Sequence, residues 1–384
     1  MLAITPNIGT IAELRIINPL RSLHRQKIIT GYKVTDFSLS QIMNDFDYYD
    51  VIIIQRTVPT YIYKRLESHG IPYILDVDDN LLANAAYRDI KAELDLIPGL
   101  AGCSILTTPN DRLVDQLEKY SQKSLKNKSH LTPNALPYPK KENLDINQPN
   151  QILWIQSDIS ALTESREDIV KAVSDISKKY ELPIILIGRS VINGESLPNQ
   201  IVMGEIDFTS NLQLLEFCST SIGIAPLETK TDEETLDFIA GKSDLKMLLF
   251  TGYGHPGVYS NSPPYTDSPF QKYGKLVPNT YSAWYEALEY QYNQGWKEIK
   301  EYASEIQNER HIDKIALECW LPAFKKCLLT KPKQGREIYE IILPENKPVQ
   351  EKNHRLIQMY NLLIKIGVPK NFLLKMYDLF ILKN

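Results

Sequence analysis

A pair of lysines lies at the start of a predicted helix in the second half of the chain. Lys242 and Lys246 flank Ser243 and Asp244, and either of the latter two can cap a helix over 244–250. The first N–H groups of a helix lack partners, and the positive end of the helix dipole attracts anions. Two lysines beside such an end can neutralise a diphosphate without a metal. The spacing therefore predicts a diphosphate site, with an ordinary solvated helix as the alternative.

A second group of polar residues is predicted in the first half of the chain. Asp78 and Asp79 follow the predicted strand 71–76, where carboxylates can bind hydroxyl groups or accept a proton. The alternative is that they cap the next helix. Arg15, in the predicted helix 11–23, can reach the same place or remain a surface arginine. Because the neighbouring sequence offers no further ligand, we predict no metal site.

Several well-known catalytic patterns are missing from the sequence. There is no GxGxxG after the first predicted strand, no GxSxG, and no glycine upstream of Gly241-Lys242-Ser243 that would make a P-loop. The four cysteines show no CxxC or Cys/His spacing, which argues against a zinc site or a disulfide framework. They are Cys103, Cys218, Cys319 and Cys327.

Short apolar runs alternate with helical patterns along most of the chain, which indicates parallel sheets. The first series has strands at 2–4, 49–56, 71–76, 103–107 and 130–132, with helices at 11–23, 60–69 and 110–119. After a linker near 137–150 the second series has strands at 152–155, 183–187, 201–203, 221–225 and 257–259, with helices at 165–180, 212–218 and 244–250. We predict an α/β protein with two tandem doubly wound, Rossmann-like domains, 1–145 and 150–322, that face each other across a ligand-binding cleft.

Residues 323–384 are predicted to form a separate basic, helical tail. Residues 325–384 hold 12 Lys and Arg against 5 Asp and Glu, and two apolar helices are expected at 354–366 and 370–382. The second of these helices is apolar on more than one face, so it needs cover. It is predicted to pack on the protein or on a second copy, or else to contact an anionic membrane surface.

The overall charge and hydropathy limit the partners and the location. The chain has 43 Lys and Arg against 47 Asp and Glu, a net charge of −4, which gives no general attraction to nucleic acid. Its apolar runs are far shorter than the roughly 20 residues of a membrane-spanning helix, and residues 1–6 do not resemble a signal peptide. We expect a cytoplasmic protein, with the tail as a means of contact with the inner face of the membrane.

Several short motifs occur in an order that is found in one known group of enzymes. They read YDVIIIQR at 49–56, LDVDDNL at 75–81, TTPN at 107–110, TPNA at 132–135, IGIAPL at 222–227, and the lysine helix followed by GHP at 254–256. Over residues 1–320 this order resembles bacterial glycosyltransferases of the GT-B fold, the family 1/family 4-like group that acts in surface-polysaccharide assembly.

The resemblance implies a hexosyltransferase that uses a nucleotide diphosphate sugar as donor and a glycan or lipid-linked acceptor, without a metal or cofactor and with retention at the anomeric carbon. It implies that the second domain binds the donor and the first the acceptor. The residues carried over are Lys246, Arg189 and Asp79 for catalysis, Lys242, Ser243, Asp244, Ser260, Asn261 and Ser262 for the donor, and Asp78 and Arg15 for the acceptor.

The sequence departs from that group at two places. Leu249 stands where many relatives have a glutamate that holds the donor ribose, and the turn after the predicted strand 152–155 has no glycine. These departures leave two alternatives open. One is a non-catalytic, glycosyltransferase-like binding subunit, and the other is a different GT-B enzyme such as a sugar epimerase.

Overall fold

The computed structural model describes residues 1–6, 8–36, 46–83, 90–137, 146–156, 162–188, 197, 199–204, 207–217 and 220–330. Its first sheet has six parallel strands in the order β2-β1-β3-β4-β5-β6. They are β1 Leu2–Thr5, β2 Lys33–Asp36, β3 Ile52–Gln55, β4 Tyr73–Asp76, β5 Ile105–Thr108 and β6 Ser129–Leu131. The central strands are short Ile- and Leu-rich runs that are buried on both faces, as parallel sheets require.

The second sheet also has six parallel strands, in the order β12-β11-β10-β7-β8-β9. They are β7 Gln151–Ile155, β8 Ile184–Ile187, β9 Gln200–Met203, β10 Ser221–Ala225, β11 Gly257–Ser260 and β12 Gly274–Val277. We call each sheet with its covering helices a lobe. The predicted fold class, an α/β protein with two Rossmann-like doubly wound domains, is therefore confirmed.

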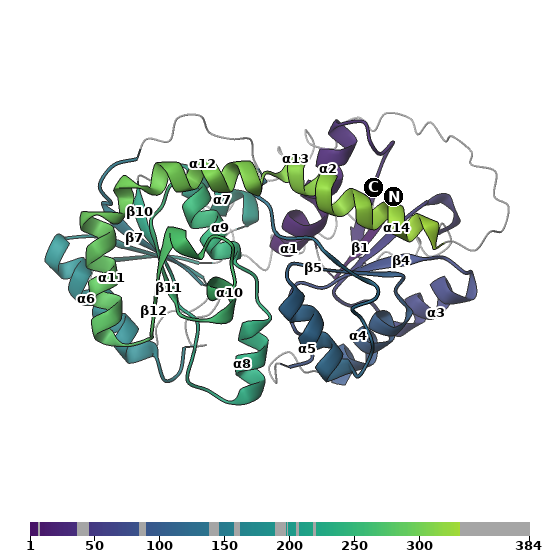
Figure 1. Cartoon of the computed structure of the whole chain (residues 1–384), viewed down its shortest axis with the longest axis horizontal. Coiled ribbons are helices and arrows are strands. Elements are labelled where there is room, and N and C mark those ends of the chain that lie inside the picture. The colour runs from purple at the N-terminus through teal and green to yellow at the C-terminus, as the bar shows by residue number, and fades with distance from the viewer. Residues whose placement is uncertain are drawn as a thin grey trace, which may run out of the picture. The chain divides into compact units, whose positions relative to one another are not determined.

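Helices cover both sheets (Figure 1). Around the first sheet these are α1 Thr10–Ala12, α2 Asn18–Arg25, α3 Thr60–Ser68, α4 Ile90–Gly102 and α5 Asp111–Ser121. After β7 follow α6 Arg166–Tyr180, α7 Phe208–Phe217, α8 Glu233–Ala240, α9 Leu245–Gly252, α10 Pro263–Thr266, α11 Tyr281–Asn293, α12 Ile299–Glu309, α13 Ile312–Ile315 and α14 Leu321–Leu329. A π-helical turn over Glu13–Ile17 joins α1 to α2, so Pro19 does not end the predicted helix.

The last helices described return to the first lobe. α14 packs on β4 and β5 (Figure 1), and a second π-helical turn, Ala316–Trp320, packs on α2. Trp320 and Phe324 share one apolar core with Ala3 and Ile53 of the first sheet. The predicted second domain, 150–322, thus ends in residues that pack on the first sheet. Apolar spacing along a helix cannot say which sheet the helix will cover.

The predicted basic tail begins at 323, and its residues from 331 onward, with the predicted membrane or subunit contact, lie outside the described residues. Across the described ranges, no helix combines the length and the apolar character that crossing a bilayer needs. Cys103, Cys319 and Cys327 are free thiols, and Cys218 is not among the described residues.

Candidate functional site

Residues of the two lobes meet at the start of α9. We call this contact zone the seam; it contains Asp79, Asn110 and Asn134 of the first lobe and Lys242 and Ser243 of the second. Asn134 Nδ2 donates to Ser243 Oγ at 2.7 Å, and Asn110 Nδ2 donates to the carbonyl oxygen of Lys242 at 3.1 Å. The carboxyl ends of β5 and β6 thereby face the helix start that the sequence predicts to bind a diphosphate.

Asp244 occupies the cap position of α9, but its side chain makes no capping hydrogen bond. Instead its carboxylate accepts from Ser268 Oγ at 2.8 Å and from Arg310 Nη2 at 3.4 Å. Asp244, one of the two predicted cap residues, is therefore the cap by position, but Ser268 and Arg310 hold its carboxylate away from the helix N–H groups. The first N–H groups of α9 keep their capacity to bind an anion.

Lys242 lies on the seam rather than in bulk solvent. Its Nζ is 3.2 Å from Asp79 Oδ1 and 4.1 Å from the centroid of the Phe238 ring, and its side chain is 30% exposed. This cation therefore links the predicted donor-binding helix to the predicted catalytic carboxylate, through one of the ion pairs between the lobes.

Lys246 is half-buried in the first turn of α9. Among the described residues, it has no hydrogen-bond or ion-pair partner. Burial, and next the charge of Lys242, lower the pKa of Lys246 to about 7. A partly buried ammonium group without a counter-ion is a good partner for an anionic ligand.

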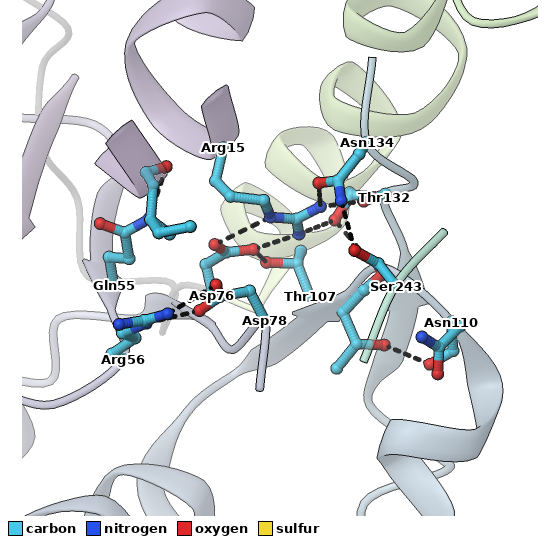
Figure 2. Close-up of polar contacts among 12 residues, drawn as sticks. Arg15, Gln55, Arg56, Asp76, Asp78, Thr107, Asn110, Thr132, Asn134 and Ser243 are labelled. Carbon is cyan, nitrogen blue, oxygen red and sulfur yellow. Dashed lines mark hydrogen bonds and ion pairs between the residues drawn. The ribbon is translucent and has the colours of Figure 1, made fainter. Parts of the chain in front are cut away.

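Arg56 completes the acidic cluster of the first lobe, and our sequence analysis did not single it out. Its Nε and Nη2 donate to the two carboxylate oxygens of Asp78 at 2.6 and 2.8 Å (Figure 2), and Nη2 lies 3.5 Å from Asp79 Oδ2. Its φ of 58° is unusual for a residue with a side chain. The sequence could have indicated this pair through position, because Arg56 directly follows β3 and Asp78 follows the adjacent strand β4.

The two carboxylates differ in their readiness to accept a proton. Burial raises the pKa of Asp79, and the Lys242 charge only partly offsets this. For Asp78 burial acts in the same direction, but the ion pair with Arg56 outweighs it and lowers the pKa. Asp79 is thus the better candidate for a base, and Asp78 is the better fixed anion. The alternative that both cap a helix finds no support among the contacts of the described residues.

Arg15 has a different environment from the one we expected. The residue is 2% exposed, and all five of its side-chain N–H groups have partners in the first lobe. Nη2 and Nε donate to Asp76 Oδ1 and Oδ2 at 2.5 and 3.3 Å, and Thr132 and Asn134 accept from the other N–H groups (Figure 2). Because no N–H is left for a ligand, we correct the predicted acceptor-binding role of Arg15 to a structural one.

The residues after β11 are arranged mainly for structure. Ser260 is fully buried; its hydroxyl donates to Asn279 Oδ1 at 2.7 Å and accepts from the backbone N–H of Leu227 at 2.8 Å. A donor-binding role for Ser260 is therefore withdrawn. Asn261 is exposed, and Ser262 caps the short helix α10 by position only. Arg189, predicted to act in catalysis, lies outside the described residues.

A cavity of about 550 Å³ opens at the seam, next to the start of α9. Its walls include prolines from both lobes, and its polar lining includes Asn110, Arg112, Ser243, Asp267 and Arg310. Arg112 Nε donates to Asp267 Oδ2 at 2.9 Å, and Arg310 pairs with Asp244, so these charges are already balanced. Asp111 and Lys242 also line the cavity. A ligand with many hydroxyl groups can bind such a polar lining.

Two observations bear on what the site lacks. Leu249 is 6% exposed within an apolar core, so no polar side chain is available at that place on α9. Within the part of the chain that the structure describes, no three His, Cys, Asp or Glu side chains gather into a group that could hold a metal ion.

Sequence comparisons do not assign the chain to a family. No family model matches it. No curated protein matches it either.

Comparison with solved structures gives its fold. A glycosyltransferase from Rickettsia africae matches with a TM-score of 0.56 at 11% identity, covering 85% of this chain and 98% of that one. A putative UDP-N-acetylglucosamine 2-epimerase from Listeria monocytogenes matches with a TM-score of 0.51 at 13% identity, covering 88% and 99%. A pneumococcal O-GlcNAc transferase, GtfA, in complex with UDP and GlcNAc, matches with a TM-score of 0.51 at 12% identity, covering 75% of this chain and 59% of that one.

These structures and this chain share two Rossmann-like domains, the arrangement called the GT-B fold. At such low identities the likeness establishes the fold, and the activity has to be argued from the site.

Proposed function

We propose that this protein transfers a sugar from a nucleotide diphosphate donor to a carbohydrate or lipid-linked acceptor. The observation that carries the proposal is Lys246, a half-buried cation with no anionic partner among the described residues, at the uncapped start of α9. The GT-B fold supports the same conclusion, since two of the similar structures are those of transferases.

In the proposed reaction the bond between the donor sugar and the diphosphate breaks as the acceptor hydroxyl attacks the anomeric carbon. The diphosphate leaves with the bonding electron pair, and Lys246 and the α9 N–H groups stabilise its growing negative charge. The hydroxyl proton moves to Asp79. Neither a metal nor a cofactor is assigned a part, and retention at the anomeric carbon rests on the family resemblance alone.

Lys242 connects the two halves of this reaction. It now pairs with Asp79 at 3.2 Å, and a diphosphate bound at α9 would compete for the same ammonium group. Movement of Lys242 toward the diphosphate leaves Asp79 with a weaker counter-charge and therefore a higher pKa. Donor binding would thus prepare the base for the acceptor proton. We place the acceptor in the 550 Å³ cavity beside Ser243, where the polar lining suits a glycan.

Titration with nucleotides tests the proposal directly. We expect one of UDP, GDP, CDP or dTDP to bind with a dissociation constant in the micromolar to millimolar range by calorimetry. The Lys246→Ala variant should lose this binding. Lys178→Ala, an exposed lysine near the far end of α6, is the matched control and should keep it. If none of the four binds the unaltered protein, the proposed donor class is wrong.

Leu249 favours a second candidate, a non-catalytic glycosyltransferase-like subunit, because its buried side chain cannot hold a ribose hydroxyl. The similarity to a putative epimerase supports a third. An assay of product formation separates them. A binding subunit retains the nucleotide sugar unchanged, an epimerase converts it to its epimer without any acceptor, and a transferase releases the nucleotide diphosphate when an acceptor is present.

A further inference from the structure

A buried carboxylate lies at the carboxyl edge of the second sheet, outside the site described above. Glu228 follows β10 and is 2% exposed. Its Oε2 accepts from the backbone N–H groups of Thr163 at 2.7 Å and Ser165 at 3.1 Å. Its Oε1 accepts from Ser165 Oγ at 2.6 Å, and from the backbone N–H groups of Thr229 at 2.8 Å and Lys230 at 3.0 Å. The Thr163 hydroxyl also donates to Oε2, at 3.2 Å, so six donors surround one side chain.

Neutral groups alone hold this anion. No cation among the described residues pairs with Glu228. Burial by itself would raise the pKa of Glu228, but the donors from Ser165 and the backbone outweigh burial and lower it to about 2. The carboxylate is therefore ionised at any physiological pH, in an environment that selects for negative charge.

Glu228 lies next to the start of α6. Ser165 is the cap residue of this 15-residue helix, and its hydroxyl bonds Glu228 instead of capping the helix. A helix start of this kind ordinarily attracts phosphate. β7, which leads into α6, pairs with β10, which leads to Glu228, so both segments emerge in the middle of the sheet edge. The chain's own carboxylate accepts from the N–H and the hydroxyl of the cap residue, at the end of the helix to which an external anion would bind.

The loop that carries Glu228 is also held from its other side. Asn279 Nδ2 donates to the carbonyl oxygen of Leu227 at 2.7 Å, and Ser260 Oγ accepts from the Leu227 N–H at 2.8 Å. The loop after β10 therefore bridges β11 and the start of α6, with Glu228 as its link to α6.

We propose that Glu228 is a positioning and specificity-determining residue, a built-in anion that fixes the start of α6 and keeps donor phosphates away from it. The specificity part of this inference rests on the proposed function. If phosphates are kept away from α6, the start of α9, with Lys242 and Lys246, is left as the place for the donor diphosphate. A phosphate beside α6 would meet a buried like charge without a counter-ion, which is strongly unfavourable.

Chemical rescue of the full-length protein tests the built-in anion without any nucleotide. Glu228→Ala removes a group the size of acetate and leaves its donors unpaired. We expect a fall in Tm of several degrees that acetate restores, relative to chloride at equal ionic strength and pH 7. Glu167→Ala, an exposed glutamate in the first turn of the same helix, is the control and should show neither effect. A Glu228→Ala protein that responds to acetate no more than the control does would overturn the proposal.

A second variant covers the case in which Glu228→Ala does not fold. Glu228→Gln keeps the size of the side chain but loses its charge and presents an NH2 group to N–H donors. The Glu228→Gln protein should fold with a lower Tm and gain nothing from acetate. It should also lose the part of the unfolding free energy that depends on ionisation of Glu228. In the unaltered protein that part is present above pH 4.5 and disappears as the pH falls toward 2. A Glu228→Gln protein as stable as the unaltered one, with the same acid dependence, would refute the role of the charge.

Inorganic pyrophosphate tests the specificity. The unaltered protein should bind one equivalent at α9, and Lys246→Ala should abolish this binding. Glu228→Ala should bind a second equivalent that acetate displaces. If Glu228→Ala binds only one, the specificity role is refuted. If the unaltered protein binds none, the proposed function fails instead, while the acetate result still stands by itself.

Discussion

Arg15 in the first lobe and Lys246 in the second are both cations withdrawn from solvent, yet they differ in how far their hydrogen-bonding capacity is used. Every N–H of Arg15 has a partner, and its carboxylate partner Asp76 is fully buried. Lys246 has no partner within the described residues.

This difference in hydrogen bonding distinguishes a cation that stabilises the fold from a cation that is available to a ligand. All the side-chain donors of Arg15 have partners, so this buried charge holds its neighbouring elements together. It joins the π-turn before α2 to β4 and to the segment after β6. A withdrawn charge without a counter-ion is costly in the free protein, and a ligand can recover that cost. Sequence analysis assigned a ligand to both cations, and only the contacts distinguish them.

The largest expected effect comes from breaking the satisfied pair. Asp76→Ala leaves the Arg15 guanidinium buried without its carboxylate, so we expect a loss of about 3–5 kcal/mol in the free energy of unfolding, measured with urea. Asp267→Ala is the control, because its pair with Arg112 is about half exposed at both side chains and should contribute at most about 1 kcal/mol. Equal losses in the two variants would show that the Arg15 cluster has no special structural weight.

Replacing the unsatisfied cation should give the opposite pattern. Lys246→Met keeps the length and apolar contacts of the side chain and removes a charge that has no partner, so stability in urea should stay equal or rise. The rate of nucleotide diphosphate release in the presence of acceptor should fall by about 10²–10³-fold, or 2.7–4 kcal/mol of barrier. A strongly destabilised Lys246→Met with normal activity would reverse the assignment of the two cations.

The pH dependence of nucleotide binding sharpens the comparison, because Lys246 titrates near neutrality. The pKa of Lys246 is lowered to about 7, and the diphosphate binds the protonated form. Affinity should therefore be highest below pH 7 and fall by up to about tenfold per pH unit above it. Calorimetry between pH 6 and 9 measures this slope, and Lys246→Arg, which stays charged throughout, should flatten it.

The same shift predicts a stability change in the absence of ligand. The pKa of Lys246 in the folded chain lies below its unfolded value, so from pH 7 to 10.5 the unfolded state binds more protons and stability rises with pH. The difference between the unaltered protein and Lys246→Met isolates this contribution. A difference that is constant with pH would place the titration of Lys246 outside this range.

The parts that the sequence predicts well are local. Runs such as Ile52–Gln55 and Ile184–Ile187 specify buried parallel strands by themselves, and the lysines at the start of α9 are recognisable within five residues of one another. These features depend on short-range periodicity and capping, which a single sequence contains.

The parts it misses are pairings between distant elements. Arg15 and Asp76 are 61 residues apart, and Arg56 meets Asp78 only because β3 and β4 are neighbours in the sheet. Glu228 bonds Ser165 from 63 residues away, and nothing in the loop around it indicates burial. The residue type showed that a charge was present, and only the strand order showed which charges meet.

The smallest expected effect concerns the bond that joins the two compared regions. Asn134 accepts from Arg15 through Oδ1 at 3.2 Å and donates to Ser243 through Nδ2 at 2.7 Å, so a chain of hydrogen bonds runs from the buried cluster to the start of α9 (Figure 2). Ser243→Ala removes the last link but leaves Asn134 oriented by Arg15. We expect a loss of about 0.5–1.5 kcal/mol in unfolding free energy and a modest weakening of acceptor binding.

A double-mutant cycle with Lys246→Met decides whether that link matters for the donor. If the buried cluster only shapes the first lobe, the effects of Ser243→Ala and Lys246→Met on nucleotide affinity should add to within about 0.5 kcal/mol. Coupling beyond that value would mean that the satisfied cluster sets the position of the α9 start. The first lobe would then contribute to donor binding through Asn134. Arg15 would still have no contact with the donor, but the Arg15 cluster would contribute to the free energy of donor binding.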